Sequence, residues 1–162
     1  MRCAITFTED RVKFNYRIVG FALHDDHVLL HRAEADDFWS LPGGRGELLE
    51  SSPETLTREM REELGIEITV DRLVWIVENF FEYDHFGFHE VAFYYQMSFP
   101  PDCALYQSRG PFAGDEEGVR LIYQWFPVSE LESVRLFPTF LRTALRDLPD
   151  SIQHVIHTDV DE

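Results

Sequence analysis

The sequence predicts an α/β fold, in which helices lie on the faces of a central mixed β-sheet. Two observations carry this prediction. Segments with a strand pattern come both before and after one clearly delimited helix, and a second amphipathic segment follows near the end of the chain. The 162 residues suit a single domain. We expect its core to span about residues 12–148, and residues 149–162 to form a flexible tail.

The first strand signals predict a β-hairpin. Residues 12–17 alternate weakly between polar and apolar side chains. Arg17–Leu23 and Val28–Arg32 are apolar runs on either side of the polar turn His24–His27, which is the pattern of two strands joined by a tight turn. Residues 33–37 follow as a polar loop.

A helix is expected after residue 51, and both of its ends carry the usual signals. Phe38–Gly44 leads toward it and ends in a sharp Pro-Gly-Gly turn. Ser51 or Ser52 can cap the first turn, and Glu54 completes a capping box with Ser51. Gly65 stands where a glycine commonly ends a helix.

This helix has two different faces. An apolar stripe at positions i, i+4 and i+8 predicts burial of Leu56, Met60 and Leu64. A neighbouring face at positions i, i+3 and i+4 carries Glu59, Glu62 and Glu63. Three like charges so close together repel one another, and they become favourable when a divalent cation lies among them, because hard cations prefer oxygen ligands. A solvated acidic helix face is the alternative interpretation.

The rest of the chain predicts mainly strands. Four more segments have a strand pattern: Ile66–Val70, Leu73–Phe81, His89–Phe99 and Leu121–Phe126. Tyr83–Phe88 is typical of a turn, and Asp102–Gly118 has the composition of a long loop. Pro127–Leu131 predicts a turn or short helix, and Phe137–Leu148 predicts an amphipathic helix.

The net charge of the chain limits the kinds of molecule that we expect it to bind. The formal net charge is -16, from 30 acidic and 14 basic residues, and such a surface repels DNA, long RNA and anionic membranes. A small phosphorylated substrate can still bind where metal ions and a few basic residues screen it. Cys3 and Cys103 are too few for a disulfide framework. With neither a signal peptide nor a membrane-spanning run in the sequence, a cytoplasmic location is expected.

Residues 44–66 match a known family motif in their spacing. The motif is G-x5-E-x7-R-E-U-x-E-E-x-G-U, where U is a bulky aliphatic residue, and all seven fixed positions are present. The segment therefore resembles the Nudix box of MutT-like hydrolases. The approach Trp39–Gly44 and the later Trp125–Pro127 are also similar to the family, and the resemblance covers residues 14–148.

The resemblance implies the Nudix fold, an α/β/α sandwich with a central mixed sheet, in which the catalytic loop and helix follow the Pro-Gly-Gly turn. It also implies an enzyme that cleaves a nucleoside diphosphate linked to another moiety, by water attack on phosphorus, with Mg²⁺ or Mn²⁺ as cofactor. Such chemistry needs metal ions to neutralise phosphate oxygens and to acidify the attacking water.

By the same resemblance, the box supplies the metal ligands. Glu59 and Glu63 are expected to be the principal ligands, and Glu62 a further ligand or the general base. The backbone carbonyl of Gly43 is expected to contribute as well. Arg58 is expected to support catalysis by orienting the loop and one of its carboxylates.

The general base stays open among four acidic residues, because family members take it either from the box or from a later position: Glu62, Glu90, Glu116 and Glu117. Glu90 and Glu117 are also candidates for contact with the substrate, and a surface acid is the alternative for each. Arg32 is the best candidate for a phosphate contact, because a guanidinium offers a bidentate fork. A solvated charge at the end of a strand is the alternative for Arg32.

One position departs from the usual motif. The family often has a glycine immediately before the position of Glu50, and this chain has Leu49 there. Because leucine disfavours positive φ, we expect the backbone angles of the loop to change at this point.

Two functional classes follow from these observations. The first is a hydrolase acting on nucleoside triphosphates, on nucleotide sugars such as ADP-ribose, or on dinucleotides. The second is a non-catalytic nucleotide-binding regulatory module on the same fold, and the intact box favours the enzyme over it. Either a monomer or a homodimer is compatible with the sequence.

Overall fold

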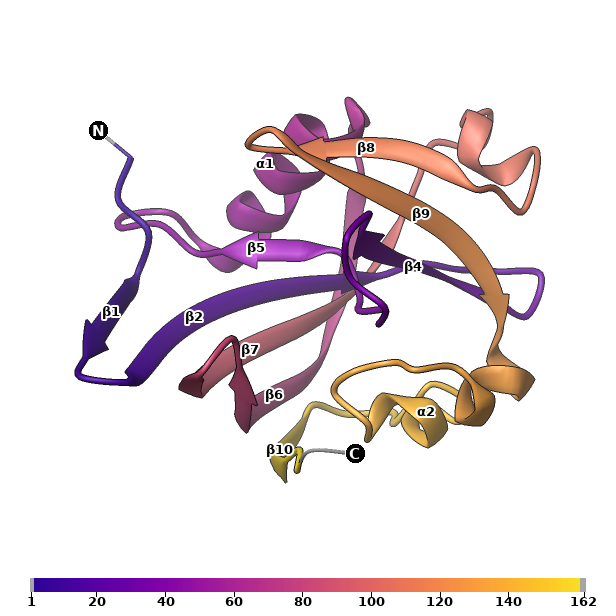
Figure 1. Ribbon diagram of the computed structural model, residues 1–162. Helices are drawn as coiled ribbons and strands as arrows, with labels where there is room; N and C mark the ends of the chain where they lie inside the picture. Colours follow the sequence, from indigo (N-terminus) through magenta and orange to yellow (C-terminus); the bar gives the residue numbers. More distant parts are fainter. Residues whose placement is uncertain (1, 161–162) are drawn as a thin grey trace.

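A computed structural model describes residues 2–160 and places two β-sheets at the centre of the fold (Figure 1). The larger sheet is mixed, with strand order β1-β2-β7-β6-β10 and with β5 paired to β2. Its strands are β1 (Thr6–Glu9), β2 (Val12–Phe21), β5 (Gly43–Arg45), β6 (Thr69–Tyr83), β7 (Phe86–Ser98) and β10 (Gln153–Thr158). The β2–β7 and β6–β10 pairs are parallel, and the other pairs are antiparallel. The predicted mixed sheet is confirmed.

A second, antiparallel sheet accompanies it, with strand order β3-β4-β9-β8. Its strands are β3 (Leu23–His24), β4 (His27–Ala33), β8 (Phe112–Glu116) and β9 (Val119–Pro127). The predicted hairpin before residue 33 exists only as the short β3–β4 pair. Most of the preceding segment belongs to β2, which pairs with β7 in the other sheet, and the chain passes from one sheet to the other at Ala22.

Helical segments cover both faces of the mixed sheet. They are α1 (Ser52–Leu64), α2 (Leu141–Ala144) and two 3₁₀ turns, η1 (Ala104–Tyr106) and η2 (Val128–Ser133). On one face, Leu56 and Met60 of α1 are fully buried in one apolar core. On the other face, Leu131 of η2 and Leu141 of α2 are fully buried in a second core. Figure 1 shows α1 and α2 on opposite sides of the strands, which confirms the predicted layers.

The ends of α1 agree with the sequence signals. The Ser51 side chain accepts a hydrogen bond from the backbone N–H of Glu54, and Oε2 of Glu54 accepts one of 2.7 Å from the N–H of Ser51. Gly65 ends the helix at φ 69°, in the left-handed conformation that suits glycine. These contacts fix where the helix begins and ends, and with it the positions of its carboxylates.

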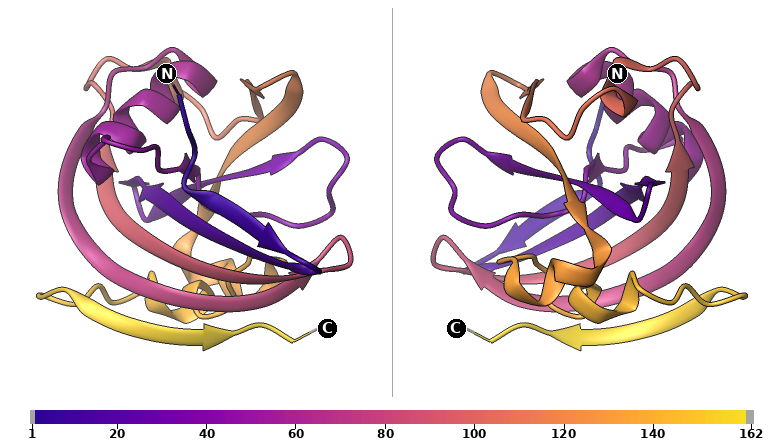
Figure 2. Two further views of the ribbon diagram at one scale, coloured as in Figure 1. Left: turned by 90° about the vertical axis from the view of Figure 1, so that its left-hand side faces the viewer. Right: turned by 90° about the vertical axis from the view of Figure 1, so that its right-hand side faces the viewer.

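The segment from residue 66 to 99 differs from its prediction. The two strands expected between residues 66 and 81 are one long strand, β6, whose pairing with β7 shifts register twice before Trp75. The expected turn over Tyr83–Phe88 shrinks to Asp84 and His85, both with positive φ, as in the tight turns that join twisted strands. The β6–β7 hairpin that results bends around one side of the molecule (Figure 2).

Two further predictions about loops are wrong. Gly43 and Gly44 do not form a sharp turn, because they belong to β5 and pair with Val19 and Ile18 of β2. The segment Asp102–Gly118 is not a plain loop, since it contains η1 and β8. Its glycines and acidic residues obscured the short strand, which pairs with β9.

The C-terminal predictions also need correction. The helix expected over Phe137–Leu148 has the predicted buried face, with Leu141 and Leu145 in the core, but only four residues are α-helical. The backbone N–H groups of Leu141 and Arg142 bond three residues back, in 3₁₀ fashion, to the carbonyl oxygens of Pro138 and Thr139. The expected flexible tail contains β10, which pairs with β6; residues 161–162 lie outside the described residues.

Within residues 2–160, the structure contains no helix with the length and apolar character needed to cross a membrane.

Candidate metal and substrate site

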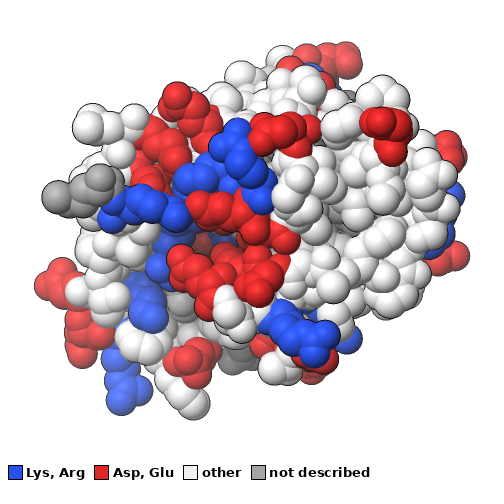
Figure 3. All heavy atoms as spheres, turned by 90° about the horizontal axis from the view of Figure 1, so that it is seen from above, with Lys and Arg blue, Asp and Glu red and all other residues white. Residues whose placement is uncertain are grey.

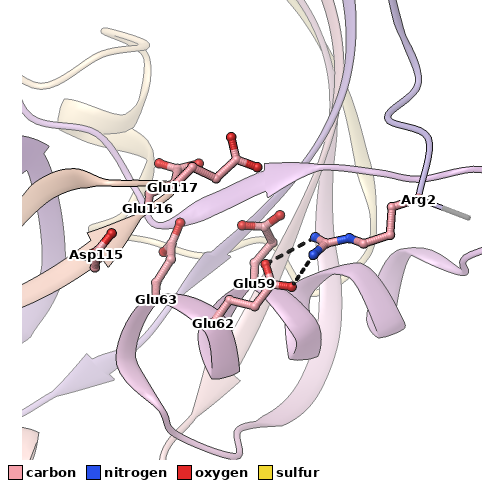
Figure 4. A pocket seen from close by; sticks show the side chains of 7 residues that line it. All are labelled: Arg2, Glu59, Glu62, Glu63, Asp115, Glu116 and Glu117. Carbon is pink, nitrogen blue, oxygen red and sulfur yellow. Dashed lines mark hydrogen bonds and ion pairs between the residues drawn. The ribbon is translucent and has the colours of Figure 1, made fainter.

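Acidic side chains gather where the C-terminal half of α1 faces the tip of the β8–β9 hairpin. They surround a pocket of about 370 Å³ that is lined by Arg2, Glu59, Glu62, Glu63, Asp115, Glu116 and Glu117. Seen from above, acidic and basic residues crowd one half of this face, and the other half is largely uncharged (Figure 3). Glu59 and Glu63 project from α1 toward the hairpin tip (Figure 4).

Three of these residues form a compact carboxylate triad, which we define as Glu59, Glu63 and Glu116. One oxygen from each lies within 4.8 Å of the others. The β8–β9 turn places Glu116 there, with Glu117 at φ 49° and Gly118 at φ 85°, as in a tight hairpin turn. From the sequence, Glu116 was a candidate base only, because its segment was predicted to be a loop.

Glu63 is the most enclosed member of the triad, with 5% of its surface exposed. Its Oε2 accepts a hydrogen bond of 2.6 Å from the Tyr123 hydroxyl. Its Oε1 is buried and has no hydrogen-bond partner among the described residues. Burial raises the pKa of Glu63 to about 8, and the negative charges of Glu116 and Glu59 act in the same direction.

Glu59 lies against the backbone of β5. A Cβ atom on Gly44 would stand 2.1 Å from the carboxyl carbon of Glu59, so only glycine leaves room for this carboxylate. Burial raises the pKa of Glu59, although Arg58, which donates a 2.8 Å hydrogen bond to its Oε1, opposes that effect. The Gly-Gly pair thus lets helix and strand approach each other at the site.

Glu62 stands beside the triad and not within it. Its side chain is 43% exposed and forms an ion pair of 3.3 Å with Arg58. A second ion pair, of 3.0 Å, joins it to Arg2 (Figure 4). Glu117 lines the same pocket from the hairpin turn. Both carboxylates are therefore near the triad and reachable by water.

Arg58 connects the loop before α1 to the triad through hydrogen bonds. It donates to both oxygens of Glu50, at 2.8 and 3.0 Å, and to the carbonyl oxygen of Arg45 at 3.2 Å. Thr55 adds a further hydrogen bond to Glu50. Because Arg58 also contacts Glu59, one guanidinium fixes the loop and a triad carboxylate together.

Two predicted site residues lie outside the pocket lining. Arg32 directs its Nη1 to the backbone carbonyls of the loop that follows β4, at 2.9 Å for Asp36 and 3.1 Å for Glu34, and stacks on Trp39. Glu90 is buried in β7 with 6% of its surface exposed, and burial raises its pKa. Neither side chain is directed to the triad by any contact in residues 2–160.

The loop before α1 has a left-handed residue at Leu49. Leu49 has φ 66°, and its side chain is fully exposed. Leucine thus adopts here a left-handed conformation that glycine adopts more easily, and a change of backbone angles relative to the family stays a prediction.

The triad fits a divalent cation. Carboxylate oxygens are the ligands that hard cations such as Mg²⁺ and Mn²⁺ prefer. The buried Oε1 of Glu63 has no hydrogen-bond partner within residues 2–160, and a cation would provide one. Burial, and to a smaller extent the neighbouring carboxylates, raise the pKa of Glu59 and of Glu63, so their charged forms are disfavoured unless a cation binds. The carbonyl of Gly43 stays a predicted additional ligand.

Comparison with known proteins agrees with this geometry. A family model described as "NUDIX domain" matches residues 15–148. Over 60 residues the chain is 33% identical to "Putative ADP-ribose pyrophosphatase YjhB" of Bacillus subtilis (strain 168), a match that covers 37% of this chain and 29% of that relative's length. The matched segment is thus less than a third of the relative.

Solved structures show the same fold at low sequence identity. A Nudix hydrolase from Nitrosomonas europaea superimposes with a TM-score of 0.60 at 15% identity, covering 90% of this chain and 79% of the other. UDP-X diphosphatase superimposes with a TM-score of 0.57 at 20% identity, covering 87% of this chain and 66% of the other. Because the family model spans most of the chain and the Nudix box supplies two of the three triad carboxylates, the chain belongs to the Nudix family.

Proposed function

We propose that the protein is a hydrolase that depends on Mg²⁺ or Mn²⁺ and cleaves a phosphoanhydride bond in a nucleoside diphosphate linked to another moiety. The observation that carries this proposal is the carboxylate triad, in which Glu59, Glu63 and Glu116 present oxygens within 4.8 Å of one another. A structural role leaves such a concentration of buried negative charge unexplained, because it opposes folding unless a cation is bound.

The residues in and around the pocket have different roles in this reaction. Glu59, Glu63 and Glu116 would hold the ion, which when bound neutralises phosphate oxygens and acidifies the attacking water. Arg58 keeps Glu59 in place through its contacts with the loop. Glu116 belongs to the triad, and so we assign the uptake of the water's proton to one of the two carboxylates beside it, Glu62 or Glu117.

The substrate class follows from charge and from the relatives. The negative net charge favours a small anion that arrives with metal ions over long nucleic acid. The relatives' names point to ADP-ribose and to nucleoside diphosphates of the UDP-X kind, and these are the first candidates. Nucleoside triphosphates and dinucleotides complete the panel.

A substrate screen tests the proposal. We expect phosphate-containing products from at least one member of a panel of ADP-ribose, UDP-sugars, nucleoside triphosphates and dinucleotides, in Mg²⁺ or in Mn²⁺. Glu63→Gln should lower kcat by about 10²-fold or more with the fold intact. Glu67→Gln is the matched control, because Glu67 is exposed and pairs only with Arg61 among the described residues.

The same experiment separates enzyme from binding module. A parent protein that binds these nucleotides but cleaves none of them under either metal would support the non-catalytic alternative. Glu62→Gln and Glu117→Gln, measured separately, then identify the base. The variant that loses turnover and also loses the acidic limb of the pH–rate profile carries that role.

A further inference from the structure

The N-terminal segment (residues 2–5) lies along the loop that leads into α1. Two backbone hydrogen bonds, of 2.8 and 2.9 Å, join this segment to residues 46–48 of the loop. Ala4 and Glu47 form an antiparallel bridge between the two. The segment is therefore held as a short strand would be, and this fixes the position of Arg2 at its start.

Arg2 reaches from this segment into the carboxylate pocket. Among the described residues that line the pocket, it is the only base. Its guanidinium forms a fork with Glu62, in which Nη1 lies 3.0 Å from Oε1 and Nη2 donates to Oε2 at 3.3 Å (Figure 4). Its Nε donates to Glu47 at 3.0 Å. A forked ion pair fixes the orientation of a carboxylate as well as its position.

A second arginine holds the same two carboxylates. Nη1 of Arg58 donates to Oε2 of Glu62 at 3.3 Å, and its Nη2 lies 3.6 Å from Oε1 of Glu47. The two arginines and the two glutamates thus form a closed ring of alternating charge. Single ion pairs at the surface contribute little to stability, but a network of them holds its members more firmly. Glu62 is therefore held in place although its side chain is 43% exposed.

The ring holds Glu62 next to the triad. Nη1 of Arg58 bonds both Oε2 of Glu62 and Oε1 of Glu59, at 3.3 and 2.8 Å. A cation among the triad carboxylates attracts Glu62 as well, because hard cations accept about six oxygen ligands or more. Arg2 engages both oxygens of Glu62, so this carboxylate has to break at least part of the fork before it joins the ion.

We propose that Arg2 is a positioning residue, which holds Glu62 away from the metal ion in the triad. Mg²⁺ usually takes only one or two carboxylates and keeps several waters. A fourth carboxylate on the ion would occupy a position that water or a substrate phosphate needs, and it would add negative charge where an anionic substrate binds. This inference rests on the proposed function for the presence of the ion, and it is tested without turnover.

The first experiment measures Mn²⁺ binding by calorimetry in the parent and in Arg2→Gln. Arg2 is 60% exposed, so the variant should fold. We expect it to bind Mn²⁺ at least about fivefold more tightly, because Glu62 is released and joins the ligands of the ion. Arg2→Lys should lie closer to the parent, since lysine keeps the charge without the fork. A general loosening of the site would instead weaken Mn²⁺ binding.

A double-mutant cycle separates positioning from a simple effect of charge. In a Glu62→Gln background, Arg2→Gln should change Mn²⁺ affinity by less than about twofold, because the carboxylate that Arg2 holds is gone. An equal gain in both backgrounds would show that Arg2 only repels the ion, and would overturn the proposal. So would an unchanged or weaker Mn²⁺ affinity in Arg2→Gln.

Arg61→Gln is the matched control for the loss of an arginine. Arg61 lies on α1, its side chain is exposed to a similar extent (56% against 60% for Arg2), and it pairs with Glu67 outside the lining of the pocket. Its removal should leave Mn²⁺ affinity unchanged. A gain as large as that of Arg2→Gln would contradict a specific role for Arg2.

The substrate screen separates this inference from the proposed function. A parent that cleaves nucleotides, while Arg2→Gln binds Mn²⁺ as the parent does, keeps the function and refutes the role of Arg2. A parent that cleaves nothing, while Arg2→Gln gains Mn²⁺ affinity only when Glu62 is present, refutes the function alone. A parent that binds no Mn²⁺ contradicts both.

Discussion

The hydroxyl of Tyr123 donates a 2.6 Å hydrogen bond to Oε2 of Glu63, while Oε1 of the same carboxylate is buried and has no hydrogen-bond partner in the described part of the chain. Tyr123 lies in β9 and is fully buried, and a Cβ atom on Gly114 of β8 would stand only 2.5 Å from its ring. The ring is therefore held in place by packing. It orients one oxygen of Glu63 so that the other is left for the triad.

Removal of this hydroxyl tests whether it positions Glu63. We expect Tyr123→Phe to fold, and to bind Mn²⁺ about tenfold more weakly or worse, as is typical when a group that orients a metal ligand is lost. A Mn²⁺ titration followed by calorimetry measures this. Tyr106→Phe is the control, because within residues 2–160 the Tyr106 hydroxyl hydrogen-bonds only to the backbone of Phe99. Equal Mn²⁺ affinity in Tyr123→Phe and in the parent would show that packing alone orients Glu63.

The pKa of Glu63 leads to a prediction about stability and metal removal. A carboxyl whose pKa is higher in the folded than in the unfolded protein binds more protons when folded, so the free energy of unfolding falls as pH rises between the two values. For Glu63 the window runs from the ordinary value of 4.5 to about 8. In EDTA we therefore expect Tm to decline across this window, and Mg²⁺ or Mn²⁺ should abolish the decline by binding the ionised carboxylates.

Glu63→Gln provides the check on this prediction. The amide does not ionise, so the decline of Tm with pH in EDTA should be shallower than in the parent, and added metal should have a smaller effect. Glu67→Gln should keep the parent's slope, because Glu67 is exposed on the surface. Identical slopes in the parent and in Glu63→Gln would mean that other groups cause the decline.

Local signals made α1 and two of the triad carboxylates predictable. The caps at Ser51 and Gly65 act over a few residues, and the spacing of Glu59 and Glu63 fixes them on one helix face. Glu116 could not be assigned to the triad in this way. Its place depends on the approach of β8 to α1, and its strand is short and rich in glycine and acidic residues.

Tertiary contacts also explain the remaining errors. Phe137–Leu148 has the apolar period of a helix and buries the expected face, but its backbone forms 3₁₀ turns around one short α-helix. Arg32 lies in β4, and the sequence favoured it as a phosphate contact because a guanidinium offers a bidentate fork. Only the folded chain shows that the Arg32 guanidinium donates to loop carbonyls.

The contact between Gly44 and Glu59 gives a third prediction. In Gly44→Ala the new methyl group would meet the carboxyl carbon at 2.1 Å, so Glu59 must move away from the triad. We expect a loss of about 1–3 kcal/mol in the free energy of unfolding, as in other overpacked sites, and Mn²⁺ affinity at least about tenfold weaker. Chemical denaturation and a Mn²⁺ titration measure the two effects.

Gly87→Ala is the matched control for this substitution. A Cβ atom there meets only the carbonyl oxygen of Arg11 among the described residues, at 3.9 Å, which is ordinary contact. Its stability should change by less than about 0.5 kcal/mol, as for most surface substitutions, and metal binding should be unaffected. If Gly44→Ala behaved like Gly87→Ala, the carboxylate of Glu59 would have room that the structure does not show.

Leu49 is the position where a stabilising change is expected. A left-handed conformation destabilises the folded state by about 1–2 kcal/mol for a residue with a Cβ atom, and glycine removes this strain. Glycine also loses more conformational entropy on folding, which costs roughly 0.5–1 kcal/mol and offsets part of the gain. The exposed side chain of Leu49 contributes no burial to offset the strain. Leu49→Gly should therefore raise the free energy of unfolding by about 0.5–1 kcal/mol, measured by urea denaturation.

The neighbouring residue separates backbone strain from a general effect of glycine. Leu48 is also exposed, at 61%, but it is not among the residues with positive φ. Leu48→Gly should therefore destabilise the protein by about 0.5–1 kcal/mol, opposite in sign to Leu49→Gly. If both substitutions lowered stability, the left-handed backbone at Leu49 would carry no strain, and the glycine that the family often has there would need another explanation, such as close approach of the substrate to the loop.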